Sequence, residues 1–166
     1  MTEDKEMTKE YWNEDVFEER YFHHTGGEKG LPWEINHHEK YLDEFWDDWR
    51  DKTVNTSSLS VLELGCGTGN DAIWFAKKGF NVTAVDISEK EINLAKEKSK
   101  GIYNINYIVD DMHSFSTEEK FDIIYDRGFI HTHNNQGIDI LKILFSKLCK
   151  MLKDEGKIII LSGNMI

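Results

Sequence analysis

Short apolar runs rich in valine and isoleucine recur through the last two thirds of the chain, separated by stretches with helical spacing. Each run is bounded by polar or glycine-containing segments, as is typical of buried strands. The runs are residues 60–64, 81–86, 105–110, 121–126 and 156–161, and the connections long enough for helices are 71–78, 88–100 and 137–153. This alternation predicts an α/β fold with a doubly wound sheet of about five parallel strands flanked by helices.

The first third of the chain follows a helical pattern instead. Apolar residues recur at helical spacing within 8–24 and more regularly within 36–52, where acidic residues fill the other face. Asn36 and Glu39 have the spacing of a capping box, which favours the start of a helix there. The stretch between the two patterns holds three glycines and the only proline, which is typical of a loop. We therefore expect two N-terminal helices joined by a loop.

Acidic residues are concentrated in this N-terminal part. The 166-residue chain has 31 Asp and Glu against 20 Lys and Arg, a net charge of -11. Residues 1–52 hold 16 acidic and 7 basic residues, whereas residues 53–166 hold 15 and 13. A chain of this charge without a Lys/Arg cluster repels phosphate backbones and anionic lipids. The composition therefore argues against nucleic-acid and membrane partners and favours small molecules.

The remaining composition indicates an ordinary globular domain. With 39% hydrophobic residues, a chain of this length can bury a core without a disulfide or metal. Its two cysteines fit a reducing compartment, and no apolar run reaches the length of a membrane span. The N-terminus is acidic and polar, unlike a secretory signal. We expect a single cytoplasmic domain.

The junction of the first predicted strand and helix reads E-L-G-C-G-T-G over residues 63–69. Glycines let a backbone turn tightly and approach a ligand closely, and the following helix N-terminus favours negative charge. A glycine-rich turn without a ligand is the alternative. A dinucleotide fingerprint would require a glycine where this chain has Asn70.

This E-x-G-x-G-x-G stretch resembles motif I of class I S-adenosylmethionine-dependent methyltransferases, which have a Rossmann-like fold. The resemblance covers about residues 61–163 and implies S-adenosylmethionine as the cofactor. It implies one methyltransferase domain over 1–166, with 1–56 as an N-terminal helical lid and 57–166 as the cofactor-binding core. It assigns cofactor contacts in motif I to Glu63, Gly65, Cys66, Gly67 and Gly69.

Two further acidic positions follow predicted strands. Asp86 can accept hydrogen bonds from both hydroxyls of a ribose, the role of an acidic residue at this place in the family, with Ile87 against the adenine. Capping of the next helix is the alternative for Asp86. Asp111 and Met112 match the family position at the adenine amino group, although Asp110 or simple solvation of the loop remains open.

The fourth predicted strand ends in Tyr-Asp-Arg-Gly. This resembles the Asp-Arg-Gly of thiopurine methyltransferase-like and related small thiol methyltransferases, which implies that Arg127 faces the active site beside Asp126. A purely structural Asp–Arg pair is the alternative. Pro32-Trp33 resembles the Pro-Trp stretch of the same branch, where the N-terminal segment covers the cofactor. Trp33 is therefore a predicted cofactor contact, with core packing as the alternative.

The seven histidines form no obvious metal set, because no Cys or carboxylate completes one around His131 and His133. No metal site is predicted. His131 follows Asp126 and Arg127 closely and could line the acceptor pocket or act as a base, with packing or surface exposure as the alternative. The three residues are candidates for catalysis, and the identity of a base stays open.

Methyl transfer is an in-line displacement that mainly requires alignment and a deprotonated nucleophile. Because a thiol is partly ionised near neutral pH, we expect a small-molecule acceptor such as a thiol or thiopurine-like compound. The alternative is a truncated, non-catalytic cofactor-binding module completed by another chain. The family normally continues with a helix and two strands, including an antiparallel one, whereas this chain stops at Ile166. We therefore expect the fifth strand to be an uncovered edge through which the chain self-associates.

Overall fold

The computed structural model divides the chain into two units, residues 1–37 and 38–166. It describes residues 40–49, 55–133 and 137–161, all of which belong to the second unit. The predicted helix at 8–24, the capping box and Trp33 lie outside the described residues. The predictions for these positions stay predictions.

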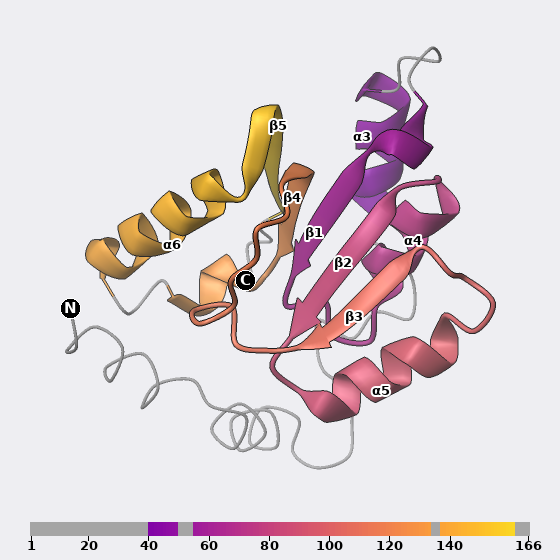
Figure 1. The fold of residues 1–166 in the computed structure, drawn as a ribbon, viewed down its shortest axis with the longest axis horizontal. Helices are drawn as coiled ribbons and strands as arrows, with labels where there is room; N and C mark the ends of the chain where they lie inside the picture. Colours follow the sequence, from indigo (N-terminus) through magenta and orange to yellow (C-terminus); the bar gives the residue numbers. More distant parts are fainter. Residues whose placement is uncertain (1–39, 50–54, 134–136, 162–166) are drawn as a thin grey trace. The chain divides into compact units, whose positions relative to one another are not determined.

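Helices and strands alternate along the described chain (Figure 1). The helices are α3 (Lys40–Trp49), α4 (Asn70–Lys77), α5 (Glu89–Lys98) and α6 (Ile138–Lys150), with short 3₁₀ turns η1 (Thr56–Ser58) and η2 (Ile130–His133). The strands are β1 (Ser60–Leu64), β2 (Asn81–Asp86), β3 (Ile105–Val109), β4 (Phe121–Arg127) and β5 (Leu152–Leu161). α3 lies within the helix predicted from the 36–52 pattern.

The strands form one five-stranded sheet in the order β3-β2-β1-β4-β5, and every neighbouring pair is parallel. This confirms the predicted α/β fold. β1 comes first in the chain among these strands and lies at the centre of the sheet. The strand order reverses between β1 and β4. Ligands of open parallel sheets bind beyond the carboxyl ends of the strands at such a reversal.

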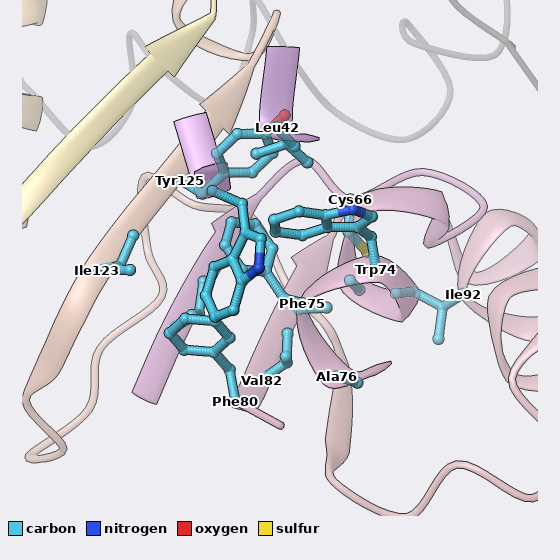
Figure 2. Close-up of a cluster of buried hydrophobic side chains, with 14 residues drawn as sticks. Leu42, Cys66, Trp74, Phe75, Ala76, Phe80, Val82, Ile92, Ile123 and Tyr125 are labelled. Atoms are coloured by element: carbon cyan, nitrogen blue, oxygen red, sulfur yellow. The ribbon is translucent and has the colours of Figure 1, made fainter. Parts of the chain in front are cut away.

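One face of the sheet is covered by α3, α4 and α5 and has an aromatic core (Figure 2). Side chains alternate between faces along a strand, which places Val61, Val82 and Tyr125 on this side. Trp46 of α3 packs edge-on against Trp74 of α4, with ring centroids 6.1 Å apart. Asp43 accepts a hydrogen bond of 2.9 Å from the Trp74 indole, which further ties α3 to α4.

The opposite face is covered by α6 and has a mainly aliphatic core. Leu62, Leu64 and Ile124 of the central strands pack there with Leu144 and Leu148 of α6. Met112 and Phe115 in the connection between β3 and β4 complete this core. The connection after β3 therefore packs beneath the sheet as part of the same core as α6.

β5 begins four residues earlier than predicted, and α6 ends at Lys150 instead of continuing to residue 153. Leu152 already pairs with Phe121, and the register then shifts before Ile123 pairs with Lys157. Glu155 adopts a positive φ of 66° within this irregular stretch. The hydrophobic pattern did not predict the first four residues of β5 because most of them are polar. Among the described helices, none is long and apolar enough to cross a membrane.

Candidate functional site

The carboxyl ends of β1, β2 and β4 bring the predicted site residues to one edge of the sheet. Leu64, the last residue of β1, pairs with Val85 on one side and Asp126 on the other. The loop after β1 therefore starts between Asp86 of β2 and Asp126 of β4. Residues separated by about sixty positions in sequence thus share one edge.

The loop between β1 and α4 depends on its glycines. Gly65, Gly67 and Gly69 have φ values of 61°, 50° and 75°, a region that side chains rarely adopt. A Cβ on Gly69 would lie 2.7 Å from the Tyr107 hydroxyl oxygen, so this glycine permits close packing. A Cβ on Gly67 would meet nothing within 4 Å, so the bare backbone of Gly67 faces open space. Gly67 is thus where a ligand could lie against the loop.

Cys66 contributes to this loop mainly through its backbone. Its N–H donates to the carbonyl of Val85 at 3.1 Å, which ties the loop to β2. Burial raises the pKa of the Cys66 thiol well above its usual value, and the neighbouring Glu63 and Asp86 add to the effect. The thiol is therefore protonated at neutral pH and is not an activated nucleophile.

The Asp86 carboxylate fixes the glycine loop from the end of β2. Its Oδ2 accepts the N–H of Gly67 at 2.7 Å and its Oδ1 accepts the N–H of Ser88 at 2.9 Å. Burial raises the pKa of Asp86, although these backbone N–H groups act to lower it. Ser88, whose hydroxyl accepts the N–H of Glu91, is the N-cap of α5. Asp86 therefore does not cap α5, and its two oxygens retain acceptor capacity.

The charge of the Arg127 guanidinium acts on two buried carboxyl groups beside this loop, those of Asp71 and Glu63. Nε of Arg127 lies 2.6 Å from Oδ2 of Asp71, an ion pair in which the Nε–H does not meet hydrogen-bond geometry. The Tyr125 hydroxyl donates to the same Asp71 oxygen at 3.1 Å. Oε2 of Glu63 is buried without a hydrogen-bond partner. A cationic ligand group would be stabilised here.

The pKa of Glu63 is raised well above its usual value, first by burial and then by the charge of Asp71, with Arg127 opposing both. Burial and the neighbouring Asp71 carboxylate thus favour the protonated form of Glu63, and a nearby cation favours the ionised form. A ligand ammonium would favour loss of this proton, because an opposite charge stabilises the carboxylate.

Asp126 and Arg127 do not pair with each other. Neighbouring residues of a strand point to opposite faces, so Arg127 reaches Asp71 on the α4 side while Asp126 points to the other. Oδ1 of Asp126 accepts the N–H of Ile130 at 3.1 Å, and Oδ2 is buried without a hydrogen-bond partner. Burial raises the pKa of Asp126 to about 6. Arg127 does pair with an aspartate, but with the buried Asp71 and not with the Asp126 that the sequence indicated.

The two aspartates after β3 shape their own turn. Oδ1 of Asp111 accepts the N–H of His113 at 2.9 Å, and Asp110 accepts the hydroxyl of Ser114 at 3.2 Å. Met112 is buried in the aliphatic core. Ile87 beyond β2 is half-buried. Contacts of Asp111, Met112 and Ile87 with an adenine stay predictions.

The histidines after β3 and β4 form a contact that the sequence interpretation missed. Nε2 of His113 lies 2.6 Å from Nε2 of His133, and His133 is fully buried. The stretch that holds His131 and His133 is a 3₁₀ turn and not an extended segment. The sequence feature that could have predicted this contact is that each of the two histidines follows the carboxyl end of a predicted strand. The His131 side chain lies outside the described side chains.

The described residues contain no group of three or more His, Cys, Asp or Glu side chains that could hold a metal ion. The described residues that fit a ligand are therefore the glycine loop and the buried carboxyl groups around it.

Residues 55–165 match a family model described as a methyltransferase domain. The chain belongs to this methyltransferase family. The chain is 35% identical over 101 residues to malonyl-[acyl-carrier protein] O-methyltransferase 1 of Ilyobacter polytropus, covering 60% of this chain and 36% of that protein. It is 32% identical over 123 residues to human EEF1A lysine methyltransferase 2, covering 70% and 52% respectively. The chain thus spans roughly a third to a half of the length of these relatives.

Solved structures share the fold. A structure described as "Conversion of a Disulfide Bond into a Thioacetal Group during Echinomycin Biosynthesis" matches 87% of this chain and 58% of its own, with 26% identity and a TM-score of 0.69. The family match covers the entire described sheet, and the glycine loop and Asp86 lie within it.

Proposed function

We propose that this chain binds S-adenosylmethionine at the carboxyl edge of the sheet and transfers its methyl group to a small-molecule nucleophile. The observation that carries the proposal is the open space over Gly67, whose N–H donates to the buried carboxylate of Asp86. Glu63, near the end of the preceding strand, adds a buried oxygen without a hydrogen-bond partner. A bare backbone admits a ligand, and the two acids match the hydroxyl and ammonium groups of this cofactor. Membership of the methyltransferase family supports the same reading.

Different residues of the site are assigned to different parts of the cofactor. Asp86 accepts the ribose hydroxyls while its backbone bonds hold the loop, and Gly65, Cys66 and Gly67 line the cofactor through their main chain. Glu63, with its unpartnered oxygen, receives the amino group of the methionine part. Gly69 closes the loop by packing on Tyr107. The adenine contacts are assigned to Ile87, Asp111 and Met112, and Trp33 is assigned to the covering segment.

S-adenosylmethionine supplies an activated methyl group on a sulfonium when bound. In the transfer, the bond from carbon to the acceptor forms as the carbon–sulfur bond breaks, and its electron pair stays on sulfur. The protein contributes alignment and a water-poor surrounding. Arg127 and Asp126, on opposite faces at the end of β4, border the place where the acceptor enters. Both are assigned to the site, and Asp126 offers its unpartnered oxygen to the acceptor or cofactor.

A thiol or thiopurine-like compound is the proposed acceptor. The relatives named above act on a malonyl group and on a lysine, so the family alone does not select one nucleophile. The echinomycin structure, which matches most of this chain, concerns the conversion of a disulfide, and it supports sulfur chemistry. A soft nucleophile that ionises near neutral pH also suits a site in which the pKa values of Glu63 and Asp126 are raised.

The alternative is a non-catalytic cofactor-binding module completed by another polypeptide along β5. In the described sheet β5 pairs with β4 alone, and Ile160 on it is 40% exposed. Unpaired strand edges with apolar side chains favour pairing with another chain, including a second copy. Methylation of thiols by the purified chain would remove this alternative. A strictly monomeric protein in light scattering would refute self-association through β5.

The first experiment is calorimetric titration of the chain with S-adenosylmethionine, its demethylated product S-adenosylhomocysteine, and NAD. We expect micromolar binding of the first two and none of NAD. Asp86→Ala removes one or two charge-assisted hydrogen bonds of about 1.5–3 kcal/mol each, which weakens binding from about tenfold to over a hundredfold. Unchanged affinity would reject the ribose assignment.

A matched pair of glycine variants tests the open space itself. Gly67→Ala places a methyl group where the cofactor would lie, so we expect binding to fall at least as far as in Asp86→Ala. Gly101→Ala, after α5, also has a positive φ and no atom within 4 Å of the added Cβ. It therefore carries the backbone strain without the obstruction, and we expect it to bind normally. Equal binding by both variants would place the ligand elsewhere.

A further inference from the structure

The contact of His113 and His133 lies one aromatic ring away from the glycine loop. Phe129 has its ring centroid 4.8 Å from that of His133 and 6.1 Å from that of His113. The Cβ of Phe129 also lies 3.2 Å from the position of a Cβ on Gly65. The loop after β3 and the turn after β4 therefore bring two imidazoles to the border of the proposed cofactor site.

The partners of His133 define where its proton lies. Nδ1 of His133 is 3.0 Å from the carbonyl oxygen of Phe129, which also accepts the hydroxyl of Thr132 at 2.7 Å. A carbonyl oxygen only accepts, so Nδ1 carries a proton and Nε2 of neutral His133 has a lone pair. Two lone pairs cannot face each other at 2.6 Å. Nε2 of His113 therefore donates to His133, and Nδ1 of His113 is the remaining basic atom.

This arrangement has room for one added proton. Protonation at Nδ1 of His113 turns its Nε2–H into a charge-assisted donor to His133, a stronger hydrogen bond than the neutral one. A second proton, on Nε2 of His133, would place two N–H groups against each other. The pair therefore titrates as one unit rather than as two independent histidines.

Charged groups from both neighbouring elements act on the pair. Asp111, in the same turn as His113, favours its protonated form, whereas Lys147 of α6, which donates to the carbonyl oxygens of Met112 and His113, disfavours it. Burial is the largest cause and lowers the pKa of both histidines. The pair is consequently neutral near pH 7 and able to accept a proton.

The two histidines differ in access. His133 is fully buried, whereas His113 is half-buried and retains exposed surface. We propose that Nδ1 of His113 takes the proton that the methyl acceptor releases, and that His133 is the positioning residue that holds His113 in the required tautomer. The step is balanced: the acceptor loses its proton to Nδ1, its electron pair forms the bond to the methyl carbon, and the cofactor sulfur keeps the electrons of the broken bond.

This proposal rests on the proposed function and narrows the acceptor to a group whose proton an imidazole can take, such as a thiol. It is tested first by long-range proton–nitrogen NMR of the full chain with ¹⁵N-labelled histidine. Spectra are recorded from pH 4.5 to 8.5, with and without saturating S-adenosylhomocysteine, and are assigned with His113→Gln and His133→Gln. Binding of S-adenosylhomocysteine is measured separately by calorimetry, so a failure of the proposed function is recognised independently.

We expect His133 to keep its proton on Nδ1, His113 to have its proton on Nε2, and the pair to gain a single proton as the pH falls. Bound S-adenosylhomocysteine should shift the His113 signals. Two independent titrations with ordinary pKa values would overturn the proposal. So would His113 signals that do not respond although calorimetry shows the ligand to be bound.

Two substitutions of His133 separate positioning from structure. His133→Gln keeps an oxygen that can accept from Nε2 of His113, and we expect the His113 tautomer and titration to be retained. His133→Leu has no acceptor, and His113 should become a mixture of tautomers. Ser114→Ala, in the exposed part of the same turn, is the control and should behave as the parent. A Gln variant that resembles the Leu variant would reject the positioning role.

Methyl transfer to 2-mercaptoethanol and 6-mercaptopurine gives the second readout. His113→Gln should slow transfer near pH 7 about a hundredfold, the usual scale of general-base catalysis, with His133→Gln retaining more activity than His133→Leu. A rate for His113→Gln equal to the parent would overturn the proton role. No transfer by the parent would reject the thiol acceptor. The NMR titration would still test whether His113 and His133 have the proposed tautomers and gain a single proton.

Discussion

Asp122 and Asp126 lie four residues apart on β4 and have opposite surroundings. Oδ2 of Asp122 accepts a hydrogen bond from the N–H of Ser60 at 2.7 Å and another from Nζ of Lys153 at 2.7 Å. These partners hold the pKa of Asp122 below its usual value, although burial acts to raise it. Asp126 has one oxygen without a partner and a pKa raised to about 6. One strand therefore carries a satisfied carboxylate at its start and an unsatisfied one at its end.

The different surroundings of the two aspartates distinguish the edge of the sheet that stabilises the fold from the edge that we propose binds a ligand. Asp122 joins β1, β4 and β5 at the amino edge, where every contact serves the fold. The carboxyl edge leaves oxygens of Glu63 and Asp126 unpaired in a buried environment, which costs stability. Titratable groups perturbed in this way cluster at functional sites. Four substitutions test the contrast.

Arg127→Met should have the largest effect on stability. In the parent, Nε of Arg127 lies 2.6 Å from the buried Asp71 carboxylate. The variant removes this guanidinium and leaves Asp71 and Glu63 without its positive charge. Breaking a buried pair in this way costs about 3 kcal/mol of unfolding free energy. Lys153→Met removes the cation of the amino edge, which is 40% exposed, and should cost less than about 1 kcal/mol. Urea unfolding at pH 7 measures both, and equal losses would contradict the contrast.

Asp126→Asn should stabilise the protein above neutral pH. Because the folded pKa of about 6 exceeds the unfolded value, the folded state binds the proton more tightly, and stability falls as the pH rises from about 4 through 6. Asparagine has no charge to bury and can still accept from Ile130. We expect a gain of about 2 kcal/mol at pH 7.5 that vanishes near pH 4. Urea unfolding across this range gives the answer, and a variant less stable at pH 7.5 would refute it.

The same variant should lose affinity for S-adenosylmethionine or for the acceptor, because the unpartnered carboxylate oxygen becomes an amide. A more stable protein with weaker binding is the pattern expected when a site is kept at the expense of stability. Undiminished binding and transfer would show that Asp126 serves neither ligand.

Asp122→Asn should give a smaller change with the opposite pH dependence. The folded pKa is lower than the unfolded one, so the carboxylate contributes stability above the unfolded pKa that is lost as the pH falls through the folded pKa. We expect the variant to be about 1 kcal/mol less stable at pH 7 and to approach the parent under acid conditions. Thermal or urea unfolding at both extremes tests this, and a pH-independent difference would contradict it.

The strands were predictable because their signal is local. The bounds of 60–64 and 81–86 agree with β1 and β2, since each apolar run ends at a glycine loop or an acidic residue. The early part of β5 was missed because Lys153, Asp154 and Glu155 are polar, and what makes it a strand is pairing with β4. A pattern within one segment does not record the neighbour that pairs with it.

The site divides in the same way. The glycine spacing and Asp86 can be read from short stretches, and both lie at the expected edge. The partner of Arg127 could not be read, because Asp71 is 56 positions away and reaches it through the packing of α4 on β4. The His113–His133 contact likewise depends on how the connection after β3 passes beneath the sheet. The roles given to Trp33 and His131 stay predictions.

The central place of β1 has a consequence for synthesis on the ribosome. One side of β1 pairs with β2, which follows it closely, but the other side must wait for β4, and the bond between Ser60 and Asp122 joins residues 62 positions apart. At translation rates of about 5–20 residues per second, that side stays open for roughly 3–12 seconds. During this interval the edge of β1 that later pairs with β4 has no partner, and an unpaired apolar edge is a target for chaperones or for nascent copies. Slow codons between β3 and β4 would lengthen the exposure, and the yield of folded protein should fall with them.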